Sequence, residues 1–451
     1  MSFSSLSNDR YFQKSGVLER SLDLVGLWEK WCGEGLAALL ESGGPPNEAA
    51  RWSILAGFPS EEVLESQGAL WYWKNGERGP LGGSLEDWMN SQAPSSDSYL
   101  PFPWCLREAW FGVWGYEWGQ PDTEKDPGPP TAHFFKPARV IAIDRLTREY
   151  FLMGDGPFEV VERGSAPETF RSWGLRAGIE REKYEGMVRK AQVYIAQGDI
   201  YQANLAHPFE ACWEGQPSGL YRLIRELNPG PFMGIFKGRG CTIVSSSPER
   251  LILGRGDLLE TKPIAGTRPR DLDEVRDLQL REELRTNPKE RAEHLMLVDL
   301  ARNDLGRVSR FGTVEVNRFS EVEAYSKVQH LVSTVRAQKK EEVTFSQVLH
   351  SLFPGGTITG CPKVRCMEII RELEGRPRGY YTGSLGYFGP GPIFDLNILI
   401  RTFTLFEDGT LEFLAGAGVV ADSDPGREYQ ETLYKVQALA KALGADWEVG
   451  P

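Results

Sequence analysis

Closely spaced strands that are joined by short turns are the feature that most limits the fold of this chain. From residue 379 to 420 the sequence is a series of strand-like runs, which turn at residues 389–392 (GPGP) and 407–409 (EDG). Another strand-like run at 241–247 precedes a hairpin at 250–261, which turns at a Gly-Arg-Gly-Asp tetrapeptide. Strands with such short connections pair in antiparallel fashion. We therefore expect antiparallel sheets.

Helical patterns alternate with these hairpins, without the regular strand-helix-strand rhythm of a nucleotide-binding fold. Apolar residues at the 3.6-residue spacing predict an amphipathic helix over residues 170–199. Residues 137–154 predict an alternating strand and a polar turn. The expected class is therefore α+β, with helices packed on antiparallel sheets.

Charge and composition argue against several classes of protein. Lys and Arg total 51 against 63 Asp and Glu, which gives a net charge of −12. Because general nucleic-acid binders need a basic surface, we expect no nucleic-acid partner. The sequence has no run of about 18 apolar residues, and its first residues lack the basic and apolar regions of a signal peptide. We expect a cytoplasmic protein without a membrane partner.

Two helix starts that are far apart in the sequence repeat one pattern of carboxylates. In each, an Asn or Asp before a proline predicts a helix cap, and two glutamates follow at i, i+3 on one helix face. These glutamates are Glu290 and Glu293 in the first helix and Glu428 and Glu431 in the second. Four carboxylates brought together repel one another unless a divalent cation lies between them, which would be a magnesium site. The alternative is that the glutamates complement the helix dipoles.

Three further segments carry polar groups whose role the spacing leaves open. Glu249 follows a proline and is either a general acid beside a leaving hydroxyl or a surface turn residue. The glycine-rich loop at 353–366 lacks the spacing of a phosphate-binding loop. The backbone amides around Gly416, Ala417 and Gly418 offer donors for a carboxylate.

Taken together and in this order, the motifs resemble the chorismate-utilising enzymes. The resemblance is carried by SSSPER, ETKPIAGTRPR, KERAEHLMLVDLARNDLGRV, KVQHLVSTV, GGTITGCPKVRCMEII, GSLGYF, NILIRT and GAGVVADSDP, the last followed by EYQET. It is dense from about Lys183 to Leu443, and LLES at 39–42 is similar to the family's N-terminal part. The resemblance implies an αβ-sandwich of two large antiparallel sheets with helices packed outside, which binds chorismate and Mg²⁺.

The same resemblance implies how the chain is divided. Residues 1–135 are expected to form the N-terminal part of the sandwich, and residues 136–451 the chorismate-binding catalytic region. We expect both parts to belong to one structural domain. The N-terminal part carries a candidate tryptophan pocket at Leu40, Glu41 and Ser42, although the sequence does not decide whether tryptophan binds there.

Motif by motif, the resemblance also implies roles for individual residues. Glu293 and Glu431 are similar to the family's Mg²⁺ ligands, with Glu290 and Glu428 reaching the ion directly or through water. The implied catalytic residues are Glu249 as the general acid for the C4 hydroxyl, His330 on the leaving-group side, and Thr267. The implied substrate-binding residues are Gln202, Ala265, Gly266, Tyr387, Arg401, Gly416, Ala417, Gly418 and Lys435. Of these, Arg401, Tyr387 and the amides near Gly418 match positions that take the enolpyruvyl carboxylate.

The residue at position 202 bears on the nucleophile. The water-using members, isochorismate and salicylate synthases, carry a lysine base where this chain has Gln202. A neutral amide cannot deprotonate water, so the resemblance favours ammonia as the nucleophile. We expect a separate glutamine amidotransferase subunit to supply it.

Two ammonia-using activities remain. The segments YQANL, NPGPF, GGTITG, DLNILIRT and DSDP resemble aminodeoxychorismate synthase, the enzyme of folate synthesis. Ala265 of PIAGT instead matches anthranilate synthases, because the best-known aminodeoxychorismate synthases have a lysine there. We expect aminodeoxychorismate synthase component I, with anthranilate synthase component I as the alternative. A catalytically silent tryptophan-binding subunit is a third interpretation, and the intact glutamates argue against it.

Overall fold

Two long strands, β3 (Trp52–Ser66) and β7 (Ala132–Asp144), connect the two sheets of this fold. The computed structural model describes residues 12–18, 22–48, 50–92, 100–120, 129–154, 158, 169–325, 327–391 and 393–445. β3 and β7 pair with each other along most of their length, with a register shift between Pro59 and Glu61. On either side of this irregularity the two strands acquire different neighbours, so each strand belongs to both sheets.

All the strand pairings of the described residues are antiparallel, as the hairpins predicted. The first sheet runs in the order β1 (Phe12–Val17), β8 (Glu149–Gly154), β7, β3, β2 (Ala37–Glu41), β11 (Phe232–Lys237), β12 (Cys241–Ser247), β21 (Thr402–Phe406), β22 (Thr410–Val419), β10 (Gln202–Gly215) and β9 (Phe170–Ala177). The short β18 (Gly360–Cys361) pairs with the start of β10.

The second sheet shares β3 and β7 with the first. It runs in the order β5 (Glu77–Pro80), β4 (Ala69–Lys74), β3, β7, β6 (Trp110–Trp114), β19 (Ser384–Gly389), β20 (Ile393–Asn397), β13 (Arg250–Arg255), β14 (Leu258–Thr261), β17 (Val328–Gln338) and β16 (Glu315–Ala324). β15 (Ile264–Pro269) also pairs with β17, and it follows β14 along the same edge.

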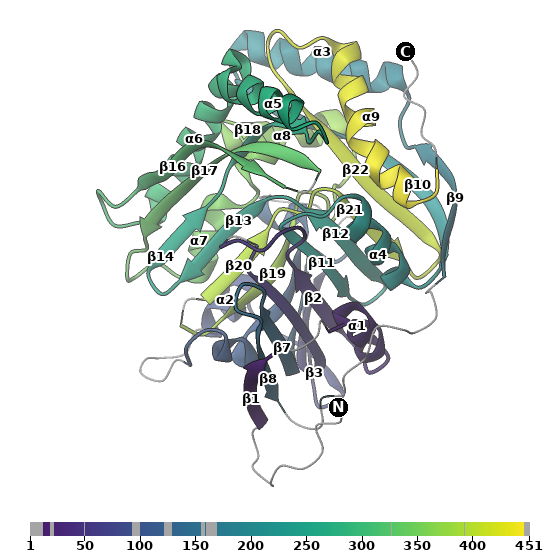
Figure 1. Cartoon of the computed structure of the whole chain (residues 1–451), viewed down its shortest axis with the longest axis vertical. Helices are drawn as coiled ribbons and strands as arrows, with labels where there is room; N and C mark the ends of the chain where they lie inside the picture. The colour runs from purple at the N-terminus through teal and green to yellow at the C-terminus, as the bar shows by residue number, and fades with distance from the viewer. Residues whose placement is uncertain are drawn as a thin grey trace.

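Helices cover the outer faces of both sheets (Figure 1). They are α1 (Leu24–Cys32), α2 (Leu85–Ser91), α3 (Arg181–Gln197), α4 (Pro217–Leu227), α5 (Glu274–Thr286), α6 (Pro288–Val308), α7 (Phe345–Leu352), α8 (Lys363–Glu374) and α9 (Pro425–Ala442). Three short 3₁₀ turns complete the described structure: η1 (Trp104–Glu108), η2 (Tyr116–Gly119) and η3 (Gly356–Ile358).

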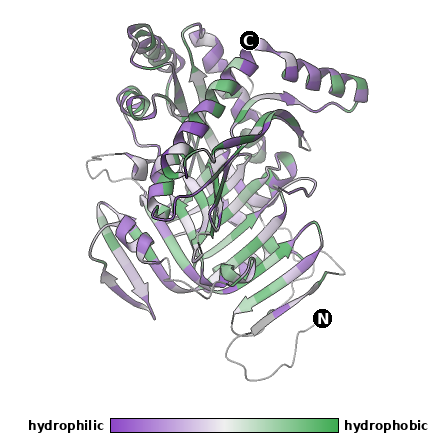
Figure 2. Ribbon diagram, turned by 90° about the vertical axis from the view of Figure 1, so that its left-hand side faces the viewer, coloured by the Kyte–Doolittle hydropathy of each residue, from purple (hydrophilic) through white to green (hydrophobic). Residues whose placement is uncertain are grey.

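Alternate side chains of the shared strands enter two different cores. On β7, Ile141 and Ile143 pack in the core that also contains residues of α1, α4 and α9. Val140 and Ala142, which point the other way, pack with residues of β6, β19 and β20 from the second sheet. Hydrophobic residues accordingly follow the strands, while the helices alternate hydrophobic and hydrophilic residues (Figure 2). The expected αβ-sandwich is confirmed.

The hairpins at 250–261 and 379–420 form as predicted, but the helix predicted over 170–199 is wrong for its first part. Residues Phe170–Ala177 form β9, whose side chains alternate between more and less exposed positions along the edge of β10. The edge of β10 has backbone groups free to pair, and this tertiary pairing overrides the helical pattern. The helix α3 begins only at Arg181.

The boundary expected between residues 135 and 136 falls inside β7. That the two parts form one structural domain stays a prediction. No helix in the described ranges combines the length and the apolar character that a membrane crossing requires.

Candidate active site

Two helices begin as the sequence predicted and present their glutamates near each other. At the start of α6, the Asn287 side chain accepts hydrogen bonds from the amides of Lys289 and Glu290 at 3.0 and 3.1 Å. At the start of α9, Asp424 accepts one from the amide of Arg427 at 2.9 Å. These caps fix the start of each helix, where Glu290 and Glu428 lie in the first turn and Glu293 and Glu431 follow one turn later.

The carboxylates of the two helices lie within electrostatic reach of each other. Burial raises the pKa of Glu293, and the charges of Glu290 and Glu431 raise it further. Burial also raises the pKa of Glu428, and the charge of Glu431 adds to this effect. The structure therefore brings the two pairs of glutamates near each other, and the repulsion disfavours the ionised forms of Glu293 and Glu428.

Three of these glutamates already have protein partners. Glu290 pairs with Arg268 at 3.1 Å, and Glu431 pairs with Lys435 at 2.8 Å. Glu428 accepts a hydrogen bond from the Ser423 hydroxyl at 2.7 Å. Among the residues that the structure places, no three metal-ligating side chains are gathered closely enough to hold an ion as they stand. The donor set nevertheless fits a hard divalent cation, since it consists of carboxylate oxygens whose repulsion a cation would relieve.

Glu249 is a buried carboxyl group, with only 5% of its surface exposed. Burial raises its pKa to about 7, while the Thr357 hydroxyl, the Ile264 backbone and the positive charge of Arg401 act in the opposite direction. The carbonyl of Glu249 accepts a hydrogen bond from the amide of Ile398 at 3.0 Å, which anchors its backbone to the segment before Arg401. A carboxyl group that is partly protonated near pH 7 can act as a general acid.

His330 and Thr267 face each other across two paired strands. The register of β15 and β17 places them opposite, and Nδ1 of His330 lies 2.9 Å from the Thr267 hydroxyl. Burial lowers the pKa of His330 to about 3, and the charge of Arg401 lowers it as well. The imidazole is therefore neutral. Its Nε2 atom is buried and has no hydrogen-bond partner within the described ranges, so it is available to a ligand.

Arg401 is held in an unusual backbone conformation beside this group. Its φ angle is 53°, a left-handed value that residues other than glycine rarely adopt. Its guanidinium donates a long hydrogen bond to the Asn228 side chain at 3.4 Å. No other hydrogen bond joins this guanidinium to a residue that the structure describes, so most of its five donors are free for a carboxylate.

The glycines of the predicted amide segment leave room in front of β10. Gly418 lies opposite Asn204 in the register of β22 and β10, with Ala417 and Gly416 next along β22. A Cβ atom at Gly416 would come within 2.2 Å of the Asn204 side-chain oxygen, so a larger residue there would require the Asn204 side chain to move. The ammonium group of Lys435 donates to the Gly416 carbonyl at 2.8 Å, which connects α9 to this segment.

The PIAGT segment lies on β15 and packs against the start of α6. Gly266 has a φ of 69°, and a Cβ atom there would come within 2.6 Å of the Glu290 carboxylate. Ala265 is 5% exposed on β15, between Ile264, whose backbone faces Glu249, and Gly266. The structure thus places PIAGT between the general-acid candidate and the glutamates.

Tyr387 is the one predicted substrate-binding residue that lies elsewhere. The centroid of its ring lies 5.6 Å from that of Phe111. Tyr387 lines a separate cavity together with Ser42. Tyr381 is the tyrosine that lies near the amide segment, since its hydroxyl would lie 2.8 Å from a Cβ atom at Gly416. The family motif pointed to Tyr387 alone, and the proximity of Tyr381 to Gly416 depends on tertiary packing that no local pattern encodes.

Asn204 is a second residue that the sequence reasoning missed. It lies two positions after Gln202 on β10, so the side chains of both residues point to the same face. The period-two pattern of the strand could have identified it.

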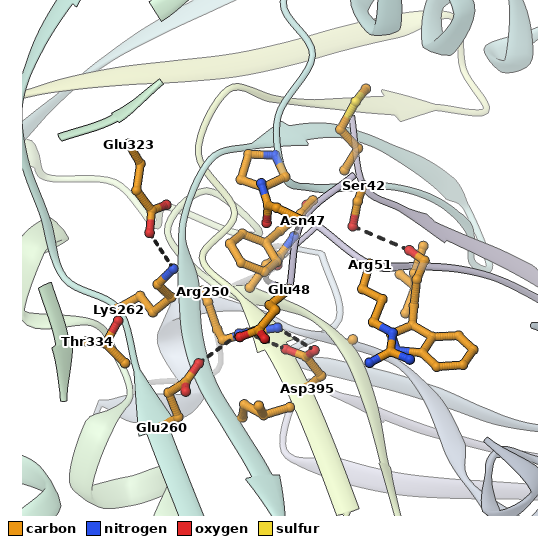
Figure 3. Close-up of a pocket in the computed structure, with 18 of the residues that line it drawn as sticks. Ser42, Asn47, Glu48, Arg51, Arg250, Glu260, Lys262, Glu323, Thr334 and Asp395 are labelled. Carbon is orange, nitrogen blue, oxygen red and sulfur yellow. Dashed lines mark hydrogen bonds and ion pairs between the residues drawn. The ribbon is translucent and has the colours of Figure 1, made fainter. Parts of the chain in front are cut away.

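The separate cavity beside Tyr387 has a volume of about 650 Å³ (Figure 3). Its lining includes Leu40, Glu41 and Ser42, the residues of the candidate tryptophan pocket. A network of charges forms part of its wall, in which Arg250 binds Asp395 through two hydrogen bonds of 2.9 and 3.0 Å. The same guanidinium pairs with Glu260 at 3.2 Å, and Lys262 pairs with Glu323 at 2.7 Å. That tryptophan occupies this cavity stays a prediction.

Comparisons with known proteins agree with this geometry. Residues 65–441 match the model of a family described as chorismate binding enzyme. An anthranilate synthase component I-like protein of Synechocystis sp. is 38% identical over 91% of this chain and 87% of its own length. Aminodeoxychorismate synthase component 1 of Bacillus subtilis is 46% identical, over 63% of this chain and 60% of its own length.

Solved structures share the fold. Anthranilate synthase component I of Streptococcus pneumoniae has a TM-score of 0.73 at 31% identity, over 87% of this chain and 93% of its own. The menaquinone-specific isochorismate synthase of Escherichia coli has the same TM-score of 0.73 at 17% identity, over 96% of this chain and 94% of its own. The second likeness concerns the fold alone.

Replacing Glu249 by Gln is expected to change how stability depends on pH. The pKa of Glu249 is raised from 4.5 to about 7, so the folded protein holds a proton that the unfolded chain loses. This raised pKa stabilises the wild type below about pH 4.5, and the contribution is lost as the pH rises to about 7. Relative to Glu249→Gln, the wild type should lose about 3 kcal/mol over this range. Urea unfolding of both proteins across the range measures the difference, and a constant difference would contradict the burial of an ionisable carboxyl group.

Proposed function

The chain belongs to the chorismate-binding enzyme family and acts on chorismate, and we propose that it is component I of aminodeoxychorismate synthase. It would convert chorismate and ammonia to 4-amino-4-deoxychorismate and water. Anthranilate synthase component I is the alternative. Both reactions remove the C4 hydroxyl and form a carbon–nitrogen bond, so they share the need for a proton donor at that hydroxyl.

The observation that carries the amination proposal is the burial of Glu249, whose pKa of about 7 keeps a proton available at neutral pH. Glu249 would give this proton to the C4 hydroxyl as the C4–O bond breaks and water leaves. The ammonia nitrogen forms the new bond to the ring and then loses one proton, which restores Glu249. Arg401 would hold a substrate carboxylate, and the neutral His330 would donate a hydrogen bond from Nε2 on the leaving-group side.

Five segments support amination at C4 by their place around this group. Asn204 of YQANL faces the glycines of β22, and Asn228 of NPGPF hydrogen bonds to Arg401, itself part of DLNILIRT. Thr357 of GGTITG lies beside Glu249, and Asp424 of DSDP caps α9. Each of the five segments therefore contributes a residue at or next to the candidate site, as PIAGT does.

Ala265 is the specific observation that favours the alternative. Its methyl group supplies no nucleophile, so no enzyme amine can attack C2 from this position. Without such an attack, ammonia entering at C2 as the C4 hydroxyl leaves gives the ortho product. Formation of the para product on this chain would require ammonia to attack C4 directly, or two successive additions.

We propose that Mg²⁺ binds between α6 and α9. Glu293 and Glu431 would hold it, with Glu290 and Glu428 reaching it directly or through water. When bound, the ion would neutralise the ring carboxylate of chorismate. Arg268 and Lys435, which now pair with Glu290 and Glu431, would have to release them.

A separate glutamine amidotransferase subunit would supply the ammonia, and the relatives named component 1 fit an enzyme with a second component. Free ammonium should replace this subunit in the assays below.

Product identity distinguishes the two activities. The purified chain, incubated with chorismate, Mg²⁺ and ammonium, is expected to yield para-aminobenzoate only when an aminodeoxychorismate lyase is added. Chromatographic separation of ortho- and para-aminobenzoate measures this. Anthranilate formed without the lyase would mean that Ala265 outweighs the five segments and that the alternative is correct.

Replacing Glu431 by Gln tests the metal site. Loss of one carboxylate ligand is expected to raise the Mg²⁺ concentration for half-maximal turnover by at least about 10-fold, because each ligand contributes charge and geometry. Calorimetric titration with Mg²⁺ should show the same weakening. Glu282→Gln, which removes an exposed glutamate paired with Arg285 on α5, is the matched control. Unchanged Mg²⁺ dependence of Glu431→Gln would remove Glu431 from the site.

A further inference from the structure

A lysine side chain closes the glycine-rich loop between α7 and α8. Lys363 is the first residue of α8, and its ammonium group donates to the backbone carbonyls of Ser351 and Leu352 at 3.2 and 2.9 Å, where α7 ends. Its third hydrogen bond goes to the carboxylate of Asp304 on α6 at 2.7 Å. One side chain therefore ties both ends of the loop at residues 353–362 to each other and to α6.

The Lys363–Asp304 ion pair is largely removed from water. The side chain of Asp304 is 8% exposed and that of Lys363 is 13% exposed. Burial raises the pKa of Asp304 and lowers that of Lys363, while each charge acts in the opposite direction on the other. Because the loss of hydration offsets much of the attraction in a buried ion pair, the pair contributes more to the position of the elements that it joins than to stability.

The loop needs such ties because three of the ten residues at 353–362 are glycine, which permits many backbone conformations. Its second half is held at the Ile358 carbonyl, which accepts a hydrogen bond from Arg378 at 3.0 Å. Its first half, up to Thr357, lies between this point and the end of α7 that Lys363 holds. The position of Thr357 therefore depends on both attachments.

Thr357 connects the loop to the proton donor. Its hydroxyl is buried, has no other hydrogen-bond partner in the described part of the chain, and lowers the pKa of Glu249. Glu249, Thr357 and Asp304 also line one cavity of about 30 Å³, so the ion pair and the proton donor adjoin the same small space. A hydroxyl that donates to one oxygen of a protonated carboxyl group leaves the proton on the other oxygen, and so sets the direction in which that proton can be given.

We propose that Lys363, through its pair with Asp304, is a positioning residue for Glu249, because it holds Thr357 where the hydroxyl orients the protonated carboxyl group. The ammonium group has three donors, and all three are used within the chain, so Lys363 acts through Thr357 and not on the substrate. This inference rests on the proposed function for the role of Glu249 as proton donor, a role that the anthranilate reaction shares.

The variant Lys363→Met of the full-length chain removes the ammonium group and keeps most of the side-chain length. With chorismate, Mg²⁺ and ammonium, kcat should fall about 10-fold or more because the acid loses its alignment, while the KM for chorismate changes less than about 2-fold. The decline of kcat/KM above about pH 7 should move up by about 0.5 to 1 pH unit, because Thr357 no longer lowers the pKa of Glu249. Steady-state kinetics at constant free ammonia measures both effects, and an unchanged pH profile would overturn the proposal.

The double variant Asp304→Asn with Lys363→Met separates position from stability and serves if Lys363→Met does not fold. It leaves no unpaired charge in the interior, so it should resist urea better than Lys363→Met. It should nevertheless keep the lowered kcat and the displaced pH profile. Recovery of wild-type kcat in the double variant would overturn the positioning role and leave Lys363 a role in stability alone.

Thr357→Val tests the path between Lys363 and Glu249. It should lower kcat and displace the pH profile as Lys363→Met does, whereas Thr357→Ser, which keeps the hydroxyl, should retain most of the activity. Because both changes remove one contact, adding Thr357→Val to Lys363→Met should lower kcat by less than about 2-fold further. Effects that multiply in full would show that Lys363 acts by another path.

Lys339→Met is the matched control. Lys339 is also buried, and its ammonium group donates to two carbonyls of another loop, those of Lys340 and Val343, at 2.8 and 2.6 Å. Its replacement should change neither kcat nor the pH profile. The same changes in Lys339→Met would mean that loss of any such lysine disturbs the site, which would overturn the specific role of Lys363.

A second readout separates this proposal from the proposed function. A wild-type chain that consumes no chorismate at any ammonium concentration would contradict the function. Urea unfolding of the Asp304→Asn, Lys363→Met variant, with and without Glu249→Gln, still reports on the pKa of Glu249. The stability that Glu249 contributes at low pH should be lost up to a pH about 0.5 to 1 unit higher than in the wild type. The same pH range as in the wild type would overturn the positioning of Glu249 by Lys363.

Discussion

The arrangement of the site depends on one buried guanidinium, that of Arg378, which is 3% exposed. It donates to the Glu374 carboxylate at 2.6 and 2.9 Å, to the Ile358 carbonyl at 3.0 Å and to the Asn204 carbonyl at 2.6 Å. Glu374 in turn accepts from the amide of Ala206 at 2.8 Å. A buried charge is stable only when it is paired and hydrogen-bonded, and these bonds meet that requirement. The pair joins α8, β10 and the loop beside Glu249 into one unit.

Next to this unit, the candidate site has a neutral imidazole and a protonated carboxyl group in one part and the glutamates of two helices in another. Burial keeps His330 neutral and holds a proton on Glu249 near pH 7, while the guanidinium of Arg401 lies within electrostatic reach of both. The glutamates of α6 and α9 form the opposite, acidic side. An anionic substrate that must lose a hydroxyl suits such a division, because its carboxylates and its leaving group need different partners.

Local sequence patterns predicted much of this structure. The hairpins and the caps at Asn287 and Asp424 follow from short-range turn and capping chemistry, which the chain encodes within a few residues. The edge strand β9 was missed because its pairing with β10 is a tertiary effect. No local sequence pattern predicts that β3 and β7 belong to two sheets, because this depends on which strands pair in the folded chain.

The site shows the same limit. Glu249, His330 and Arg401 were placed through the motifs of a family, and the structure brings them together. Tyr381 was missed because its proximity to Gly416 arises from tertiary packing, which the motif around Tyr387 does not encode. Asn204 was missed because the lack of a partner for its side-chain oxygen becomes visible only once the surrounding strands are in place.

The central claim is that the buried Glu249 supplies the proton for loss of the C4 hydroxyl. The most direct measurement is the pH dependence of kcat/KM for chorismate, with free ammonia held constant and Glu249→Gln as the comparison. Because the pKa of Glu249 is about 7, kcat/KM should be level below that pH and fall about 10-fold per pH unit above it. Glu249→Gln should lose about 100-fold or more of the activity and this pH dependence. A wild-type profile that stays level well above pH 7, or a Glu249→Gln variant with near-normal activity, would contradict the account.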